Sequence, residues 1–354
     1  MSVTRSSPAT TELAAAPPPR GRPPGSRVAG RVAGLAGSLL LLLLVLALSI
    51  GVGAKELSLG EVWHGLLDRS AASYPVVHQM RLPRTLLGLV AGIALGLAGG
   101  VMQALTRNPL ADPGLLGINA GASAAAATAA SFLGVATFAG YVWFALAGAA
   151  VVSVLVYAVG GGRGATPARL ALAGSALNAV CYSYVSAVML LNTTALDRLR
   201  FWTVGSLAGA TPGTVAAMLP FVAVGLVLAL ALARPLNALA LGDDSARALG
   251  AHPGRVRGAA IVAVTLLCGA ATAACGPIVF VGLLVPHVVR ALTGPDLRWL
   301  LPYCALLAPV LLLGADVLGR VLGRPGELEV GIVTTVLGGP FFLAVIRHGR
   351  VAQA

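Results

Sequence analysis

Long apolar runs recur along almost the whole chain, and they limit its possible folds more than any other feature. The run from Gly34 to Gly53 carries no charged residue over a length that lets a helix cross a bilayer. A membrane-spanning segment must satisfy its own backbone hydrogen bonds, and a run of this length does so as a helix. The sequence therefore predicts an all-α polytopic membrane protein.

Apolar runs of this kind predict about ten transmembrane helices. They are expected at about 34–53, 85–104, 115–134, 138–160, 169–191, 213–233, 259–276, 279–292, 300–319 and 330–347. The seventh and eighth runs are hard to separate around Gly276-Pro277. Residues 34–350 are thus expected to form one transmembrane domain. Residues 1–33, rich in Pro, Ala and Arg, are expected to be a disordered basic tail.

The distribution of basic residues predicts the orientation of the spans. Placing the N-terminus inside and letting ten spans alternate puts 16 of the 24 Lys and Arg residues on the inner side. Short cytoplasmic loops carry an excess of Lys and Arg, so an N-in/C-in topology is predicted and the basic tail is cytoplasmic. The net charge of +12 is therefore interpreted as a topology signal, and no nucleic-acid partner is expected.

Several kinds of chemistry are disfavoured by the residues present. The one lysine, Lys55, lies in Gly-Ala-Lys-Glu, so the sequence lacks the Gly-x-x-x-x-Gly-Lys-Ser/Thr loop that binds nucleotide phosphates. The cysteines lie in apolar runs without Cys-x-x-Cys spacing, which is typical of buried small side chains (Cys181, Cys268, Cys275 and Cys304). The chain is therefore not expected to be an enzyme, to carry catalytic residues, or to bind a metal or cofactor.

Ionisable residues are almost missing from the middle of the predicted spans. Asp316 is the nearest case, and it lies toward the outer end of the ninth span. An ion-coupled transporter usually keeps a carboxylate or His at membrane depth for its coupling ion. This pattern disfavours a stand-alone ion-coupled secondary transporter, which remains the alternative class, and favours energy delivered from outside the membrane.

The longest polar interruption in the second half of the chain is the segment 234–258, on the predicted cytoplasmic side. Pro235 can start a short helix that Gly242 breaks, and two aspartates then place negative charge at the start of a second helix. Gly250 is placed to end the second helix, and Pro253 can open the next. Such a segment is either an ordered loop that caps its own helices or a rigid surface for a soluble partner.

Three stretches of the sequence, taken in order, resemble one protein family. They are 81–117, which begins Arg-Leu-Pro-Arg-Thr-Leu; 239–250 with 276–290, which includes Gly-Pro-Ile-Val-Phe-Val-Gly-Leu-Leu-Val-Pro-His; and 315–320 with 327–342. Their order and spacing are similar to those of the FecCD family, the permease subunits of ABC importers for ferric siderophores, haem and vitamin B12.

The resemblance implies a type II ABC importer permease fold in the bacterial inner membrane. It implies a second permease subunit (the same or a homologous chain), two ABC ATPase subunits that use the ATP and Mg, and an extracytoplasmic substrate-binding protein. Iron(III)-siderophore complexes are the preferred substrate, and haem or vitamin B12 is the alternative. Pro167-Ala168 replaces the small polar residues of the vitamin B12 importers, which argues against vitamin B12.

The resemblance also assigns a role to the segment 236–250, which would form the coupling helices that dock in a groove of the ATPase. The residues implied in this contact are Leu239, Leu241, Gly242, Asp243, Asp244, Ala246, Arg247, Leu249 and Gly250. Apolar faces would fill the groove, and the charged side chains would pair with those of the ATPase.

Two further sites follow from the resemblance. Arg81, Arg84 and Arg320 would receive glutamates of the binding protein, because the planar guanidinium fork holds a carboxylate bidentately; the alternative is interfacial snorkelling at helix ends. Asn108 and Leu110 would help to close the pathway on the cytoplasmic side, and the alternative there is a rigid turn between helices. Pro286-His287 is interpreted as structural.

Overall fold

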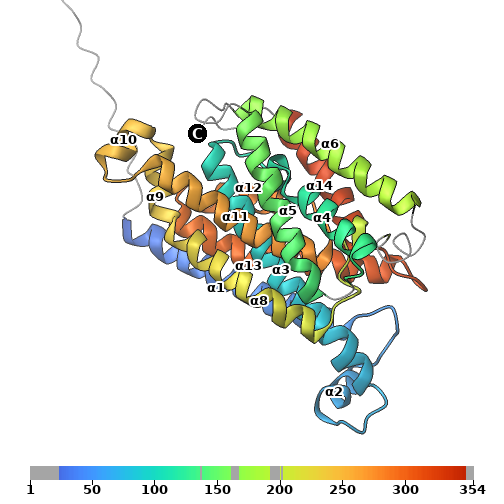
Figure 1. Cartoon of the computed structure of the whole chain (residues 1–354). Helices are drawn as coiled ribbons and strands as arrows, with labels where there is room; N and C mark the ends of the chain where they lie inside the picture. Colours follow the sequence, from blue (N-terminus) through green and yellow to red (C-terminus); the bar gives the residue numbers. More distant parts are fainter. Residues whose placement is uncertain (1–23, 136–137, 161–166, 192–199, 201, 348–354) are drawn as a thin grey trace, which may run out of the picture.

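The computed structural model describes residues 24–135, 138–160, 167–191, 200 and 202–347. Every regular element within these ranges is helical, and the helices form one bundle (Figure 1). The elements are α1 (Pro24–Gly51), α2 (Leu59–Leu67), η1 (Val76–Arg81), α3 (Leu82–Thr106), η2 (Pro113–Leu116), α4 (Ile118–Phe132), α5 (Phe138–Val159), α6 (Pro167–Leu191), η4 (Trp202–Val204), α8 (Pro212–Ala231), α9 (Ala233–Ala240), α10 (Asp243–Ala248), α11 (Pro253–Cys275), α12 (Val281–Thr293), α13 (Leu297–Leu322) and α14 (Val330–Arg347).

Each of the ten predicted spans coincides with one helix of the structure. Within the described ranges, seven helices are long and apolar enough to cross a membrane: α1, α3 together with η1, α5, α6, α8, α11 and α13. The other three are shorter, because α4 has 15 residues, α12 has 13, and the apolar part of α14 covers Val330–Val345. The all-helical polytopic fold is thus confirmed, while the count of ten crossings stays a prediction.

The boundary between the seventh and eighth predicted spans lies at Gly276. Helix α11 ends at Cys275, and Gly276 has a φ of +74°, a conformation that favours glycine. A Cβ added at Gly276 would lie 1.7 Å from the carbonyl oxygen of Trp202, so the close approach of this loop also requires glycine. The two spans are therefore separate helices, and α12 starts at Val281.

The first helix starts earlier than the sequence predicts. Helix α1 begins at Pro24, so the last part of the expected disordered tail is helical in the structure. Tertiary contacts explain the difference, because the Arg31 side chain donates to the Thr293 carbonyl at 2.8 Å and Tyr303 Oη donates to the Arg31 carbonyl at 2.6 Å. The tail prediction for residues 1–23 lies outside the described residues.

Helix α3 is the most deeply buried of the seven spans, with 83% of its most apolar stretch inside the protein. It packs against α8, α11, α12 and α13. Glycines allow these contacts, because a Cβ at Gly99 would lie 1.9 Å from the Gly282 oxygen and one at Gly92 would lie 2.5 Å from Pro309 Cα. The backbone of α3 therefore touches the backbones of α12 and α13.

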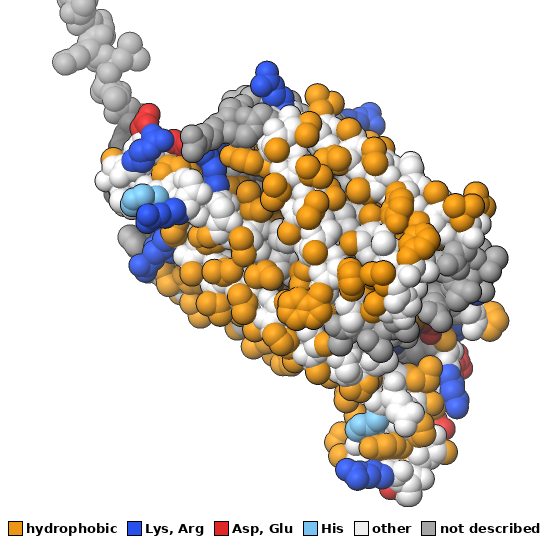
Figure 2. All heavy atoms as spheres, in the orientation of Figure 1, with side chains coloured by type: hydrophobic (Ala, Val, Ile, Leu, Met, Phe, Trp, Pro, Cys, Tyr) orange, Lys and Arg blue, Asp and Glu red, His pale blue; other side chains and the backbone are white. Residues whose placement is uncertain are grey.

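The two ends of the bundle differ in structure. Helices α9 and α10 lie at one end, close to the start of α1, whereas α2 and its flanking loops project beyond the opposite end (Figure 1). Hydrophobic side chains cover much of the face of the bundle seen in Figure 2 between these ends, and basic side chains gather near α10. This distribution is the one expected of a bundle whose sides face lipid and whose ends face water.

Candidate functional site

The segment 234–258 contains the two short helices that the sequence predicts. Helix α9 ends at Ala240, α10 begins at Asp243, and Gly242 between them has a φ of +108°. Gly250 follows α10 with a φ of +80°. Both glycines adopt conformations that other residues reach only with strain, so their identity shapes the helix pair.

The predicted coupling residues divide into an inward and an outward set. Leu239 and Ala246 are buried in the core and fix the helix pair to the bundle. Leu241 and Leu249 are 67% and 66% exposed, so they form an apolar surface that nothing in the described chain covers. Asp244 and Arg247 pair with one another at 2.6 Å on the same outer surface. The outward set is therefore the part that can contact a soluble partner.

Asp243 belongs to neither set, because it joins three elements inside this chain. Its Oδ1 accepts from Arg107 Nη2 at 3.0 Å and from Arg257 Nη2 at 2.9 Å. Arg107 also donates to the Leu239 carbonyl. The charge cluster Arg107–Asp243–Arg257 thus fastens the end of α3 and the start of α11 to the helix pair. The predicted contact of Asp243 with the ATPase stays a prediction, and it would be made by a carboxylate that two arginines already hold.

The electrostatics of Asp243 agree with this role. Partial burial acts to raise the pKa of its carboxyl group, but the guanidinium groups of Arg257 and Arg107 outweigh burial and hold that pKa below its ordinary value. The carboxylate is therefore charged throughout the physiological range. In the sequence, Arg107 lies at the end of a predicted span and directly before the turn at Asn108, and this position is the local signal for its role.

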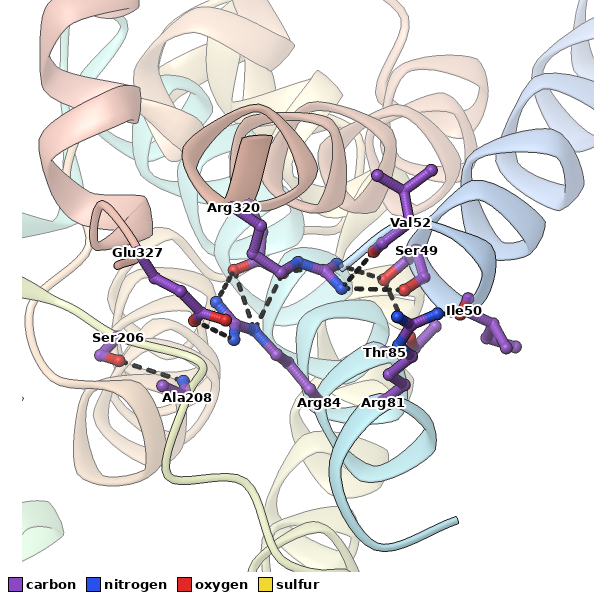
Figure 3. A network of polar contacts seen from close by, with 11 residues as sticks. Ser49, Ile50, Val52, Arg81, Arg84, Thr85, Ser206, Ala208, Arg320 and Glu327 are labelled. Carbon is purple, nitrogen blue, oxygen red and sulfur yellow. Dashed lines mark hydrogen bonds and ion pairs between the residues drawn. The ribbon is translucent and has the colours of Figure 1, made fainter. Parts of the chain in front are cut away.

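The opposite end of the bundle holds a buried cluster of charges (Figure 3). Arg84 Nη2 lies 2.7 Å from Asp316 Oδ1, and a second Arg84 nitrogen pairs with Glu327. Arg320 Nη2 lies 2.9 Å from Asp316 Oδ2, and Arg320 Nη1 donates to the Ser49 carbonyl at 2.9 Å. Asp316 is therefore shared by two arginines and links α3 to α13, while Arg320 links α13 to α1.

Arg81 lies beside this charge cluster and is satisfied by the backbone. Its guanidinium donates to the carbonyl oxygens of Ile50, Gly51 and Lys55 at 2.7–2.8 Å. These are acceptors at and beyond the C-terminal end of α1, where helix carbonyls lack helical partners. Arg81 therefore caps α1 and fixes the loop that follows it.

The three arginines expected to meet a binding protein are thus directed into the chain. Arg81, Arg84 and Arg320 are 4%, 8% and 2% exposed, which also excludes interfacial snorkelling for them. Each guanidinium group finds acceptors within the described chain. Their docking role stays a prediction, and it would require a partner carboxylate to displace one of the internal acceptors.

The predicted cytoplasmic gate is a tight turn against the ends of two helices. Asn108 Oδ1 accepts from the backbone nitrogen of Leu110 at 2.9 Å, which fixes the turn. Leu110 lines a small apolar hollow together with His287 of α12 and Phe341 of α14. The rigid-turn interpretation is confirmed in this respect, and the gating role stays a prediction. The loop before Pro167 lies outside the described residues.

Helix α6 has polar side chains on an exposed face. Only 17% of its most apolar stretch is buried, and Ser175, Ser183 and Ser186 are exposed along it. Tyr182 and Tyr184 are each 39% exposed on the same helix. Ser175 Oγ donates to the Ala171 carbonyl at 2.8 Å, and Tyr184 Oη lies 2.8 Å from Thr128 Oγ1, so these two hydroxyls are satisfied within the chain. The exposed hydroxyls of Ser183 and Ser186 favour water or another polypeptide over lipid beside this face.

Taken together, the apolar spans, the rigid helix pair at one end and the buried charge cluster at the other define a polytopic membrane protein whose two ends differ. A model of the FecCD transport family matches residues 40–348, and the chain belongs to that family. It is a multi-pass protein of the bacterial plasma membrane, and it acts as the permease subunit of an ABC importer.

Two relatives and one solved structure illustrate the match. The ferric enterobactin transport system permease protein FepD of Escherichia coli is 46% identical over 92% of this chain and 98% of its own length. The hemin transport system permease protein HmuU of Yersinia pestis is 38% identical over 88% of this chain and 94% of its own. An inward-facing metal-chelate type ABC transporter superposes with a TM-score of 0.77 at 28% identity, covering 89% of this chain and 98% of that one.

Proposed function

We propose that this permease carries iron(III)-siderophore complexes across the plasma membrane. The observation that supports this substrate is the 46% identity to the ferric enterobactin permease FepD, which extends over 98% of FepD. Because the similarity extends over almost the whole length of both chains, it includes the membrane-spanning helices that must accommodate the substrate. It also includes the ends of the bundle that meet partners.

Haem is the second candidate substrate, and the similarity to the hemin permease HmuU favours it. The identity to HmuU is lower than that to FepD over a comparable length, so the siderophore is preferred. Vitamin B12 ranks below both, because Pro167-Ala168 departs from the small polar residues of the vitamin B12 importers.

The proposed topology has ten crossings with both termini in the cytoplasm. Two contacts support placing the start of α1 and the end of α14 at the end that carries α9 and α10. Arg31 lies against Thr293 at the end of α12, and the end of α14 packs beside Leu110. An even number of crossings returns the chain to its starting side. The excess of basic residues at this end favours the cytoplasm.

The proposed energy source is a pair of separate ATPase subunits that bind ATP and Mg, and this chain binds no cofactor itself. The outward leucines, Leu241 and Leu249, supply an apolar contact for a groove of the ATPase. Movement of the helix pair would reach α3 through the Arg107–Asp243–Arg257 charge cluster. Since α3 crosses the whole bundle, the same helix would carry that movement toward the outer end.

A second permease subunit, identical or homologous, would complete the pathway. The exposed Ser183 and Ser186 of α6 support this, because a pathway between two subunits would supply water or polar groups where lipid supplies none. An extracytoplasmic substrate-binding protein would deliver the iron chelate to the outer end of this pathway.

Uptake by a strain that lacks this gene tests the proposal. Iron-55 bound to a catecholate siderophore, labelled haem and labelled cobalamin would be supplied in parallel. The expected result is loss of siderophore uptake alone, restored by the wild-type chain but not by Leu241→Ser/Leu249→Ser. Loss of haem or cobalamin uptake alone would reject the siderophore assignment. Transport by the purified chain alone, driven by an ion gradient, would reject dependence on an ATPase.

A further inference from the structure

The chain between α1 and α3 forms a small folded projection at the outer end of the bundle, the outer lobe (residues 52–80). Figure 1 shows α2 beyond the ends of the long helices. Ser58 and Glu61 start α2 with reciprocal hydrogen bonds, Ser58 N to Glu61 Oε2 at 2.7 Å and Glu61 N to Ser58 Oγ at 3.2 Å. These contacts fix the beginning of the helix without help from a partner.

The inner face of α2 is fixed to the segment that leads into α3. Ser73 Oγ donates to the Glu61 carbonyl at 2.7 Å, and Val62 and Val77 are buried between the two segments. A Cβ at Gly65 would lie 2.8 Å from Ser73 Oγ, so the helix lies very close to its support. The outer lobe is therefore preorganised rather than a loose connection.

The outer face of α2 carries large apolar side chains that nothing in the described chain covers. Leu59, Trp63 and Leu67 recur every fourth residue, so they form one stripe along the helix. Leu59 is 86%, Trp63 62% and Leu67 68% exposed, and Met80 is also exposed on the lobe. Figure 2 shows hydrophobic side chains on this projection. Trp on a rigid support is a side chain that dominates binding energy at protein interfaces.

The charges of α2 favour a protein over a lipid surface as the partner. Helices that lie on membranes carry Lys and Arg on their polar face. Between Leu59 and Leu67 the ionisable side chains are Glu61 and His64, and Asp68 and Arg69 follow directly. The helix therefore lacks the Lys- and Arg-rich polar face of helices that lie on membranes. The position of the lobe beyond the ends of the spans also removes the stripe from the bilayer core.

The charges beside the stripe indicate what the partner presents. A hollow of about 380 Å³ adjoins the start of α2 and is lined by Glu56, Ser58 and Arg324, among others. Arg324 pairs there with Glu56, whose side chain is 79% exposed, and its guanidinium also donates to the Gly53 carbonyl. Because Glu56 is exposed, a partner carboxylate could replace it at Arg324. The guanidinium groups of Arg81, Arg84 and Arg320, in contrast, are buried.

We propose that the Leu59–Trp63–Leu67 stripe is the docking surface for the substrate-binding protein, which meets it with an apolar patch bordered by a carboxylate that reaches Arg324. This inference rests on the proposed function, because it names the surface by which the outer partner of the importer is held. The outer lobe continues through η1 into α3, so a partner seated on α2 pushes on the helix whose other end holds Asp243.

The test measures binding of the purified substrate-binding protein encoded with this transporter to the complete permease–ATPase complex in nanodiscs. Trp63→Ala is expected to raise the Kd by at least about tenfold, because it removes the central aromatic anchor. Trp143→Ala is the matched control, since Trp143 on α5 is 64% exposed on the side of the bundle and is expected to leave the Kd unchanged. Gel filtration and thermal unfolding confirm that both variants are folded.

Four results separate the possibilities. An unchanged Kd for Trp63→Ala, with tight binding by the wild-type complex, overturns the docking surface alone. The contribution of Trp63 to the fluorescence is the part that Trp63→Phe removes. If brominated lipid quenches this part, the stripe lies in the membrane, which also overturns the docking surface. A shift of Trp63→Ala from dimer to monomer would assign the stripe to a second permease subunit. If the wild-type complex does not bind the substrate-binding protein at all, that result rejects the outer partner named in the proposed function, and the docking surface with it.

Discussion

Asp316 stands between two arginines, and its carboxylate lies 2.7 Å from Arg84 Nη2 and 2.9 Å from Arg320 Nη2. Arg84 starts the central helix α3, whereas Asp316 and Arg320 lie one turn apart on α13. Asp316 is fully buried and both arginines are nearly so. The shared carboxylate of Asp316 thus ties α3 to α13 at the end of the bundle opposite α10.

Replacing this carboxylate should damage folding. Asp316→Ala leaves two buried guanidinium groups without their shared counter-ion, and loss of one partner from a buried ion pair costs about 3–5 kcal/mol. Glu56→Ala is the control, because Glu56 pairs with Arg324 at the surface and such a pair contributes about 0–1 kcal/mol. Thermal unfolding in detergent micelles measures both. Equal midpoints for the two variants would contradict the role of Asp316.

The crossing of α3 and α12 makes a second prediction about stability. A methyl group at Gly99 would overlap the carbonyl oxygen of Gly282, so Gly99→Ala must separate the helices and should cost about 3 kcal/mol. At Gly314 on α13 an added Cβ meets nothing within 4 Å, and Gly314→Ala should be neutral or gain up to about 1 kcal/mol. Unfolding midpoints that rise equally for both would show that helix propensity, not the close approach, governs Gly99.

The sequence predicts the positions of the helices well because the signals for them are local. An uninterrupted apolar run, Gly242 between two short helices and Pro253 at a helix start are each read within a few residues. The charge cluster is different, because Arg84 and Asp316 are 232 positions apart and nothing local marks them as partners. Replacing Arg84 by Glu would place a third carboxylate beside Asp316 and Glu327 and would disturb folding. Such a variant therefore could not test docking of the binding protein separately from folding.

The outer lobe also went unpredicted, although the sequence holds two signals for it. Ser58-x-x-Glu61 is a capping-box pattern, and Leu59, Trp63 and Leu67 follow helical spacing. The helix has only nine residues and follows a long apolar run, so these local signals do not distinguish it from an ordinary connection between spans. The exposure of its apolar stripe, in contrast, depends on the packing of Val62 against Val77 and required the structure.

The contact between α9 and α13 should depend on acidic pH. Asp296 accepts hydrogen bonds from Arg298 and Asn237, and these bonds lower its pKa from 3.8 to about 2. A carboxyl group whose pKa is lower in the folded state stabilises the fold above its unfolded pKa and loses that contribution as the pH falls toward 2. The free energy of unfolding of the wild type should therefore exceed that of Asp296→Asn by at most about 2 kcal/mol at pH 7, since one pKa unit equals about 1.4 kcal/mol.

The measurement for this prediction is the difference in unfolding midpoint between wild type and Asp296→Asn from pH 7 to pH 2. The difference should be constant down to about pH 5 and vanish near pH 2. Asp244→Asn serves as the control, because that side chain is fully exposed and should follow wild type at every pH. A wild-type advantage that grows in acid would show the opposite sign and refute the assignment.

The exposed polar face of α6 predicts where two permease subunits meet. Ser186→Cys should be crosslinked to a second copy, in the same or a homologous subunit carrying the equivalent cysteine, by a short bis-maleimide in native membranes. Leu48→Cys on α1 is the control, because Leu48 is exposed within an apolar stretch suited to lipid. The wild-type chain accounts for background from Cys181 on α6. Crosslinked dimer at position 48 but not at 186 would place the subunit contact on α1 instead.

The division of the predicted coupling residues into an inward and an outward set gives the sharpest test of how this chain receives energy. Leu241→Ser/Leu249→Ser changes the exposed leucines, so the chain should insert and fold normally but lose copurification with the ATPase and all uptake. Leu239→Ser instead places a hydroxyl in the core beneath the same helices, so the amount of folded permease itself should fall. Fluorescence-detected gel filtration separates these two effects, because it reports the folded permease and its ATPase complex as distinct peaks. An intact ATPase complex with the double variant would mean that the ATPase is held elsewhere. The helix pair would then be an ordered cap on the bundle, as the alternative interpretation of its sequence holds.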